Sequence, residues 1–268
     1  MTTLVDVNCW IGGYPFRHVP HPEAAILRRV IERDGVSEAW VGHLPSAWWR
    51  DPAHANAELY DALAQHASAL RPVPTVRPDW PHWRDHLDAA RRHNAPAVRA
   101  YPAQWGFAAE HPAMRELASA CAAAGLVLIL TTRFEDARQR HWMDTAADLS
   151  AAAIRWIARD GVAEVIVTAP SRTLVEEVHW GLTPDERARI TWDISWLWGP
   201  PEDDLAHLLR TVGGDRFVYG TAWPLRLTQL PRANLDLLPP ELAGVTLASG
   251  SAISARARES AATVSAAP

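Results

Sequence analysis

Eight short apolar runs, alternating with helical patterns, limit the folds open to this chain of 268 residues. Their length and nearly continuous apolar character are typical of parallel strands buried on both faces. Eight strands are the number that a closed (β/α)8 barrel needs, and such a barrel takes about 250 residues. The predicted strands are Leu4–Cys9, Glu38–Gly42, Val73–Val76, Ala97–Ala100, Val127–Leu130, Glu164–Thr168, Ile190–Asp193 and Phe217–Gly220.

Helix signals fall between these runs. Ala24–Glu32 carries its apolar side chains at the spacing of one helical face, and Arg115–Ala124 is rich in alanine. Gly125 follows the second segment, at a position where a left-handed helix cap is expected. We therefore predict an α/β chain that forms one (β/α)8 barrel domain over residues 1–260. The small and polar residues 261–268 are expected to form a frayed tail.

An open doubly wound sheet is the main alternative fold, and it would also place ligands at the carboxyl ends of its strands. The G-x-G-x-x-G pattern that binds phosphates in that fold is absent. The chain also contains no lysine, so a P-loop cannot form. Without lysine there is no Schiff base, no covalently held pyridoxal phosphate and no carboxylated lysine. We predict no cofactor.

Charge and cysteine content exclude further classes of partner. The formal net charge is -5 without a block of like charges, which predicts neither a nucleic acid nor a membrane partner. No apolar run approaches the roughly 20 residues of a membrane-spanning helix, and Met1–Val7 does not resemble a signal peptide. Cys9 and Cys121 have neither metal-binding nor redox spacing, so a cytoplasmic protein with free thiols is expected. The oligomeric state stays open, and a homo-oligomer is compatible with the sequence.

Four segments carry a resemblance to a known family. Val5–Gly12 reads V-D-V-N-C-W-I-G, and Phe217–Pro224 reads F-V-Y-G-T-A-W-P. They look like the opening strand (D-x-H-x-H-x-G) and the last strand (F-G-S/T-D-x-P) of the amidohydrolase-related family of metal-dependent hydrolases. Gly125–Thr131 aligns with a strand that ends there in a metal-binding histidine, and Ser249–Ala252 resembles the family's G-N-A turn. The resemblance covers nearly the whole chain and implies the same barrel.

The side chains that hold the metal in that family are replaced in this chain. The paired histidines, the strand-five histidine and the final aspartate correspond here to Asn8, Trp10, Thr131 and Ala222. The strand-six histidine has no counterpart. Such a set is a poor ligand field for a divalent metal. Among the remaining histidines, His18 and His21 lie between prolines and His43 is alone on its strand. We therefore predict no metal site.

In a barrel of this kind, function is located where the strands run into the following helices. The 14 tryptophans, several in predicted loops, are compatible with ordinary packing or with an apolar pocket that excludes water. Arginine forks at this rim match the geometry of a carboxylate or a phosphate, although each could instead pair with a neighbouring acid. We predict contacts with a small anionic substrate from Arg17, Arg99, Arg133, Asn8, Trp10, His43, Thr131 and Trp223.

Three residues after the strands are candidate acid–base groups: Asp193, Glu135 and Tyr101. Asp193 ends the seventh strand, and apolar neighbours would raise its pKa toward the range useful for proton transfer. The alternative is an aspartate that only caps the following loop. Asp6 is expected to point into the barrel below Asn8 and to accept structural hydrogen bonds.

Together these features predict a metal-independent enzyme that acts on a small anionic, partly apolar substrate by acid–base chemistry. The family resemblance implies hydrolysis of a lactone or an amide, whereas decarboxylation, elimination or isomerisation needs only a positioned acid or base. The alternative is a catalytically silent barrel that binds a ligand or a partner protein. Converging arginine and carboxylate groups in a closed cavity would favour the enzyme. A mouth filled by Trp10 and Trp223 would favour the silent barrel.

Overall fold

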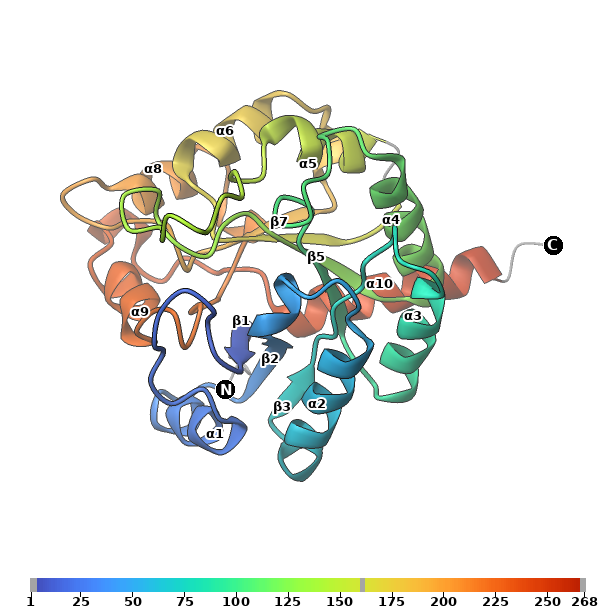
Figure 1. Cartoon of the computed structure of the whole chain (residues 1–268). Helices are drawn as coiled ribbons and strands as arrows, with labels where there is room; N and C mark the ends of the chain where they lie inside the picture. Colours follow the sequence, from blue (N-terminus) through green and yellow to red (C-terminus); the bar gives the residue numbers. More distant parts are fainter. Residues whose placement is uncertain (1–3, 160–161, 266–268) are drawn as a thin grey trace.

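A computed structural model describes residues 4–159 and 162–265. In this part of the chain eight strands lie side by side, and the helices that follow them lie around the outside (Figure 1). The predicted (β/α)8 barrel is therefore confirmed. The strands are β1 (Val5–Ile11), β2 (Glu38–His43), β3 (Leu70–Pro72), β4 (Ala97–Ala100), β5 (Val127–Thr131), β6 (Val165–Thr168), β7 (Ile190–Asp193) and β8 (Phe217–Val218).

The strands close into a ring. Neighbouring strands pair in parallel in two ladders, β1–β2–β3 and β4 to β8. Isolated bridges join the ladders at both seams, where Thr75 pairs with Arg99 and Cys9 pairs with Trp223. At the second seam the Trp10 amide also donates to the Trp223 carbonyl at 2.8 Å. Because the ring is closed and parallel, the carboxyl ends of all strands meet at one mouth.

The helices pack apolar faces against the outer surface of this ring. α1 buries Leu27 and Ile31, as the spacing of its apolar residues predicts. α4 begins at Pro112, where a missing N–H costs nothing, and Gly125 ends it with φ of 68°. The helices are α1 (Ala24–Arg33), α2 (Ala53–Leu63), α3 (Trp83–Arg92), α4 (Pro112–Ala124), α5 (Ala151–Arg159), α6 (Arg172–Trp180), α7 (Pro184–Arg187), α8 (Asp204–Thr211), α9 (Gln229–Asp236) and α10 (Gly250–Ser265).

The last helix, α10, covers the amino-terminal end of the barrel. Its Ile253 belongs to the same buried cluster as Val5 and Val7 of β1. Gly250 starts the helix so close to β1 that an added Cβ would lie 2.8 Å from a methyl group of Val7. None of the helices in the described residues has both the length and the apolar character that crossing a membrane requires.

Two predicted boundaries change. The third strand pairs with β2 over Leu70–Pro72 rather than over Val73–Val76. Prolines cannot donate to a ladder, so the chain beyond Pro72 joins the barrel wall through single bonds such as the Val76 amide to the Arg99 carbonyl at 3.0 Å. The predicted tail overlaps α10, which extends to Ser265 in a segment rich in alanine, a residue that favours the helix. Residues 266–268 lie outside the described part.

An irregularity in β1 changes which of its side chains face the barrel interior. The register of β1 against β2 shifts between Asp6 and Cys9. Val7 lies in the interior cluster, whereas Cys9 packs among the outer helices and donates from Sγ to Asp6 Oδ2 at 3.1 Å. The prediction that Asp6 points into the barrel with Asn8 is therefore wrong, because a bulge reverses the alternation of a strand. Asp6 instead accepts hydrogen bonds from the Thr221 amide at 3.1 Å and the Thr221 hydroxyl at 2.6 Å.

Candidate functional site

A polar cluster fills the barrel interior at the carboxyl ends of the strands, and Asn8 is its centre. The Asn8 side-chain amide donates to Asp193 Oδ2 at 2.6 Å and to Ser195 Oγ at 3.3 Å. Its Oδ1 accepts a hydrogen bond from the Arg99 guanidinium at 2.9 Å. Asn8, Asp193 and Arg99 are all completely buried. The Asn8 amide therefore bridges a buried carboxyl group and a buried cation, with its oxygen toward the cation.

Asp193, at the end of β7, is held by groups from three strands. The Ala169 amide after β6 donates to its Oδ1 at 2.8 Å, opposite the bond from Asn8. Gly220, which follows β8, has no side chain that would collide with the Asp193 carboxyl group, since an added Cβ would lie 2.6 Å from Asp193 Oδ2. Burial raises the pKa of Asp193 to about 6, against the opposing effect of its hydrogen bonds from Ser195, Ala169 and Asn8. Its carboxyl group therefore titrates near neutral pH.

Arg99 of β4 supplies the positive charge of the cluster. Besides Asn8, its guanidinium donates to Thr131 Oγ1 at 3.4 Å and to the Val7 carbonyl at 3.4 Å. Its Cζ atom lies 4.5 Å from the centre of the Trp10 ring, in a cation–π contact. Burial lowers the pKa of Arg99, while nearby Tyr101 and Asp193 act in the opposite direction. The prediction that Arg99 lies on the open rim is wrong, because it points into the barrel.

The residues at this place do not fit the metal centre that the family resemblance implies. Three of the four corresponding side chains, Asn8, Trp10 and Thr131, contact the Arg99 guanidinium. The fourth, Ala222, has no donor atom. A divalent cation among these side chains would meet a fixed positive charge, and none of the four side chains is an anionic ligand. Across residues 4–159 and 162–265, no group of three or more His, Cys, Asp or Glu side chains could hold a metal ion.

The arginines predicted to bind an anion at the rim are already paired with carboxylates. Arg17 contacts Glu135 at 2.7 Å, and Arg133 contacts Asp148 at 2.9 Å. Asp148 also pairs with Arg140. The alternative considered from the sequence, pairing of each arginine with a nearby acid, therefore describes both Arg17 and Arg133.

The other candidate acid–base groups lie apart from Asp193. Glu135 pairs with Arg17 on the rim. Tyr101 is completely buried, and its hydroxyl accepts a hydrogen bond from Trp10 Nε1 at 3.4 Å. Within the described residues no hydrogen bond joins Asp193, Glu135 and Tyr101 to one another.

His43 and Trp223, two further predicted substrate contacts, also lie outside the polar cluster. His43 ends β2 and contacts Glu58 at 3.2 Å, and Glu58 contacts His54 on its other oxygen at 3.0 Å. Burial lowers the pKa of His43, against the effect of Glu58. Trp223 is half-buried and contributes its backbone to the seam with β1.

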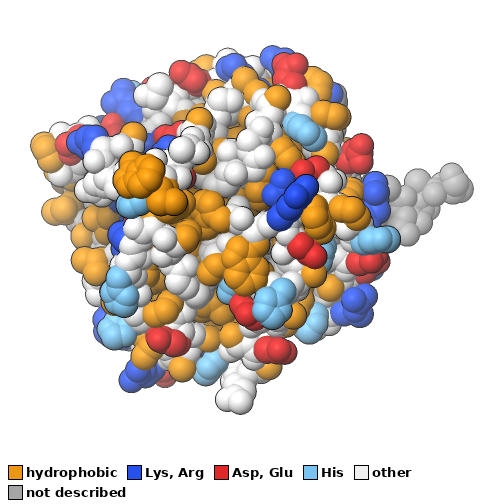
Figure 2. Space-filling model, in the orientation of Figure 1, with side chains coloured by type: hydrophobic (Ala, Val, Ile, Leu, Met, Phe, Trp, Pro, Cys, Tyr) orange, Lys and Arg blue, Asp and Glu red, His pale blue; other side chains and the backbone are white. Residues whose placement is uncertain are grey.

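Aromatic side chains cover the polar cluster on the side of the mouth. Trp10, Tyr14 and Phe134 belong to one buried cluster, and the partly buried Phe16 and Trp48 pack against it. The Trp48 and Phe134 rings lie 4.7 Å apart, and Trp10 is only 1% exposed. Figure 2 shows charges of both signs scattered among apolar side chains on the face that it presents, without a patch of one sign. In this conformation Asp193 is therefore shielded from solvent.

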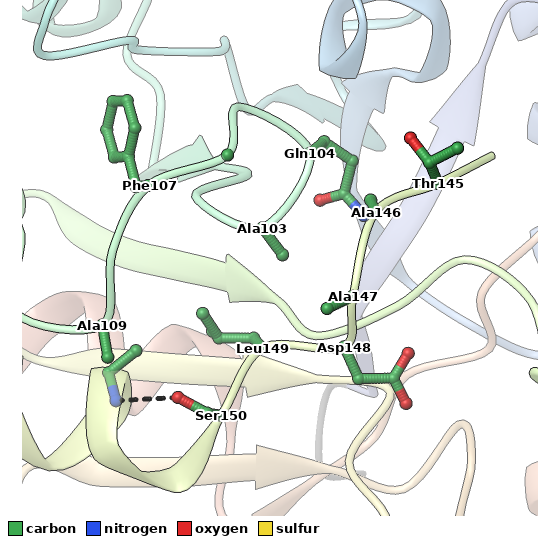
Figure 3. Close-up of a pocket in the computed structure, with 12 residues that line it drawn as sticks. Ala103, Gln104, Phe107, Ala109, Thr145, Ala146, Ala147, Asp148, Leu149 and Ser150 are labelled. Carbon is green, nitrogen blue, oxygen red and sulfur yellow. Dashed lines mark hydrogen bonds between the residues drawn. The ribbon is translucent and has the colours of Figure 1, made fainter.

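A pocket of about 420 Å³ lies beside the mouth rather than over the cluster. It separates the loop after β4, with Gln104 and Phe107, from the segment before α5, with Asp148 and Ser150. Figure 3 shows Gln104 reaching across toward Thr145 and Ala146. The carboxylate of Asp148 on its wall is the one that Arg133 and Arg140 share.

Arg226, which follows β8, was not among the residues predicted from the sequence. Its Cζ atom lies 3.2 Å from the centre of the Trp196 ring and 5.1 Å from that of Trp198. Burial lowers the pKa of Arg226 to about 10, while Glu135 and Asp193 act in the opposite direction. Arg226 lies three residues beyond Trp223, the last residue predicted to contact substrate, and no sequence pattern around it pointed to a site.

Comparisons with known proteins give matches of fold only. No protein-family model matches the sequence, and no curated protein matches it. A 5-carboxyvanillate decarboxylase from Novosphingobium aromaticivorans, solved with manganese and 4-hydroxy-3-methoxy-5-nitrobenzoic acid, is 12% identical, with a TM-score of 0.68 over 93% of this chain and 95% of that chain. A 2,6-dihydroxybenzoate decarboxylase from Rhizobium is 11% identical, with a TM-score of 0.68 over 97% and 99%.

A third similar structure is a hydrolase. The probable 2-pyrone-4,6-dicarboxylic acid hydrolase from Acinetobacter baumannii, solved with citric acid, is 8% identical, with a TM-score of 0.59 over 88% of this chain and 91% of that chain. The resemblance to amidohydrolase-related barrels is thus confirmed for the fold. The chain has the (β/α)8 barrel fold of these structures, and a buried arginine contacts three of the four side chains at the positions where the resemblance implies metal ligands.

Proposed function

We propose that this protein is a metal-independent enzyme that acts on a small anionic, partly apolar acid by proton transfer at Asp193. The observation that carries the proposal is a buried carboxyl group with a pKa of about 6 at the carboxyl end of a barrel strand. Enzymes with this architecture hold their reactive groups there, and perturbed pKa values gather at such sites. A carboxyl group with that pKa can both donate and accept a proton near neutral pH.

The neighbours of Asp193 support proton transfer more than hydrolysis. Asn8 and the Ala169 amide hold the carboxyl group in one orientation, and Arg99 supplies a nearby cation that stabilises negative charge. Decarboxylation, elimination or isomerisation of an acid needs one such positioned group. Hydrolysis also needs an activated nucleophile. The three similar barrels are all named for carboxylic acids, which supports an anionic substrate.

The covered mouth sets a condition on this function and favours a second candidate. Substrate reaches Asp193 only when the aromatic side chains around Trp10 and Phe134 move apart. If they stay closed, the protein is a catalytically silent barrel that binds a ligand or a partner at its rim. The observation that favours this second candidate is the burial of Trp10 against Arg99, above the polar cluster.

The test is an activity screen followed by a pH–rate profile. Wild type would be assayed by absorbance and by CO2 release with hydroxybenzoic acids, other small unsaturated acids and ring lactones. If Asp193 acts as a base, kcat/KM rises with pH through about 6; if it acts as an acid, kcat/KM falls through the same range. Asp193→Asn should lower kcat by at least about a hundredfold while circular dichroism shows a folded protein. A folded Asp193→Asn variant with full activity excludes this role.

A further inference from the structure

The arginines at the mouth differ in whether their charge has a partner. Arg17, Arg133 and Arg140 are held by Glu135 or Asp148. Arg138 pairs with Asp136 at 2.8 Å and is largely exposed. Across the described residues Arg226 has neither a carboxylate partner nor a side-chain hydrogen bond, and it is half-buried. Among the described arginines at the mouth, Arg226 is therefore the one whose charge is not paired with a carboxylate.

Stacking leaves the hydrogen-bonding edge of Arg226 available. A guanidinium lying over an indole ring uses its flat face, and its N–H groups point outward in the plane of the fork. Trp196 supplies that ring at 3.2 Å, and Trp198, at 5.1 Å, borders the same guanidinium on the solvent side. Trp196 is 4% exposed, so it forms a fixed support for the cation. The Trp196 ring thus holds the Arg226 guanidinium in place, while its N–H groups can still donate hydrogen bonds to a ligand.

The surroundings of Arg226 favour an anion with an apolar body. Arg133 lies on the same indole, with its Cζ atom 5.8 Å from the ring centre, and its positive charge lowers the pKa of Arg226 further. An anion placed between these cations relieves their repulsion. Phe134 belongs to the aromatic cluster at the mouth and Leu225 packs against that cluster, so both supply apolar surface beside the charge.

We propose that Arg226, stacked on Trp196, is the residue that binds the carboxylate of a small acid at the mouth of the barrel. This inference rests on the proposed function for the kind of substrate, but it concerns binding and not chemistry. A bidentate contact between the guanidinium and a carboxylate would supply the partner that Arg226 lacks. The acid would then lie over the aromatic cluster that covers Asp193.

The experiment is calorimetric titration of the purified full chain with benzoate and, separately, with inorganic phosphate. Wild type should bind one benzoate per chain, and Arg226→Gln should bind it about ten to a hundred times more weakly, since a hydrogen bond to a charged group is lost. Arg226→Lys keeps the charge without the fork and should lose part of the affinity. Arg138→Gln, the matched control for a paired and exposed arginine, should bind within about twofold of wild type.

Asp193→Asn separates this proposal from the proposed function. It should bind benzoate at least as tightly as wild type, because it removes a negative charge near the anion. Loss of binding in Arg226→Gln supports the carboxylate site even if no substrate is ever turned over. Absence of benzoate binding in wild type, or equal affinity in wild type and a folded Arg226→Gln, overturns the proposal. Equal affinity for phosphate and benzoate overturns the assignment to an acid with an apolar body.

Discussion

At the scale of single residues, the central feature is a carboxyl group that is completely buried yet close to its titration point at neutral pH. The two oxygens of Asp193 accept hydrogen bonds from Asn8 and from the Ala169 amide, and these favour the charged form. Burial favours the neutral form more strongly, so the pKa rises to about 6 from an ordinary value of 3.8. Asp193 therefore links the folding free energy to pH.

The sign of this linkage gives the first prediction. Because the folded pKa lies above the unfolded value, the contribution of Asp193 to stability is fully present below about pH 4 and is lost as the pH rises through 6. The total loss is about 3 kcal/mol, at 1.36 kcal/mol for each pKa unit, and most of it falls between pH 4 and pH 7. Urea unfolding of wild type and Asp193→Asn across this range measures it, and the variant should lack this part of the pH dependence.

The quantity to compare is how the free energy of unfolding changes with pH in each protein, and not the absolute stability of Asp193→Asn. In Asp193→Asn an NH2 group replaces one carboxyl oxygen, so it faces the N–H donor of Asn8 or of Ala169 that this oxygen accepted from. The lost hydrogen bond costs about 1–3 kcal/mol at every pH. Other carboxyl groups titrate equally in both proteins and cancel in the difference between the two curves. Parallel curves for the two proteins would contradict the raised pKa of Asp193.

At the scale of secondary-structure elements, the candidate site depends on the close approach of β1, β7 and the end of β8. Gly220 lies where a Cβ would be 2.6 Å from Asp193 Oδ2 and 3.0 Å from the Cβ of Asn8. Real Cβ atoms do not approach oxygen so closely, so one of the strands or the Asp193 carboxyl group must move if a side chain is added. The spacing of these three elements is therefore part of the site.

The second prediction follows from this spacing. Gly220→Ala should lower the free energy of unfolding by about 1–3 kcal/mol, the usual cost of overpacking a core. Gly13→Ala is the matched control, because no atom lies within 4 Å of the Cβ that it adds, and it should change stability by less than about 0.5 kcal/mol. Chemical denaturation of both variants checks the difference. Equal stability of the two would show that the strands have room to separate.

At the scale of the whole molecule, the chain shares its fold with a decarboxylase that was solved with manganese, but its own side chains place an arginine inside the barrel. The cation at the carboxyl ends of its strands is the guanidinium of Arg99, which is part of the chain and cannot dissociate. The side chains that contact this guanidinium are an amide, a hydroxyl and an indole ring, and the Asp193 carboxyl group lies on the other side of the Asn8 amide. Stability and binding should therefore not depend on an added ion.

The third prediction is that the purified protein carries no stoichiometric transition metal and that chelators change neither its melting temperature nor its binding of benzoate. The physical reason is that Asn8, Trp10 and Thr131 contact a fixed cation and that Ala222 has no ligand atom. Elemental analysis of protein purified without chelators is the measurement. One zinc, manganese or iron per chain that disappears when His18, His21 or His43 is replaced would contradict it.

The sequence by itself determined the features that depend on local pattern. Runs of apolar residues predicted eight strands, and helical spacing with prolines and glycines at the ends predicted the helices between them. The chemistry of single positions could also be read directly. Asn8, Trp10, Thr131 and Ala222 are poor metal ligands in any conformation, and the absence of lysine excludes its chemistry wherever it would lie.

Only the tertiary structure decided which side chains meet. One irregularity in β1 turned Asp6 outward and left Asn8 between Arg99 and Asp193, residues far apart in the sequence. Arg99 and Arg133 both lie at or just after the end of a predicted strand. The structure buries Arg99 in the barrel interior, whereas Arg133 pairs with Asp148. The physical reason is that a side-chain contact depends on strand register and on the path of a loop. A shift of one residue reverses the face of a strand, and the path of the chain after β8 places Arg226 on Trp196.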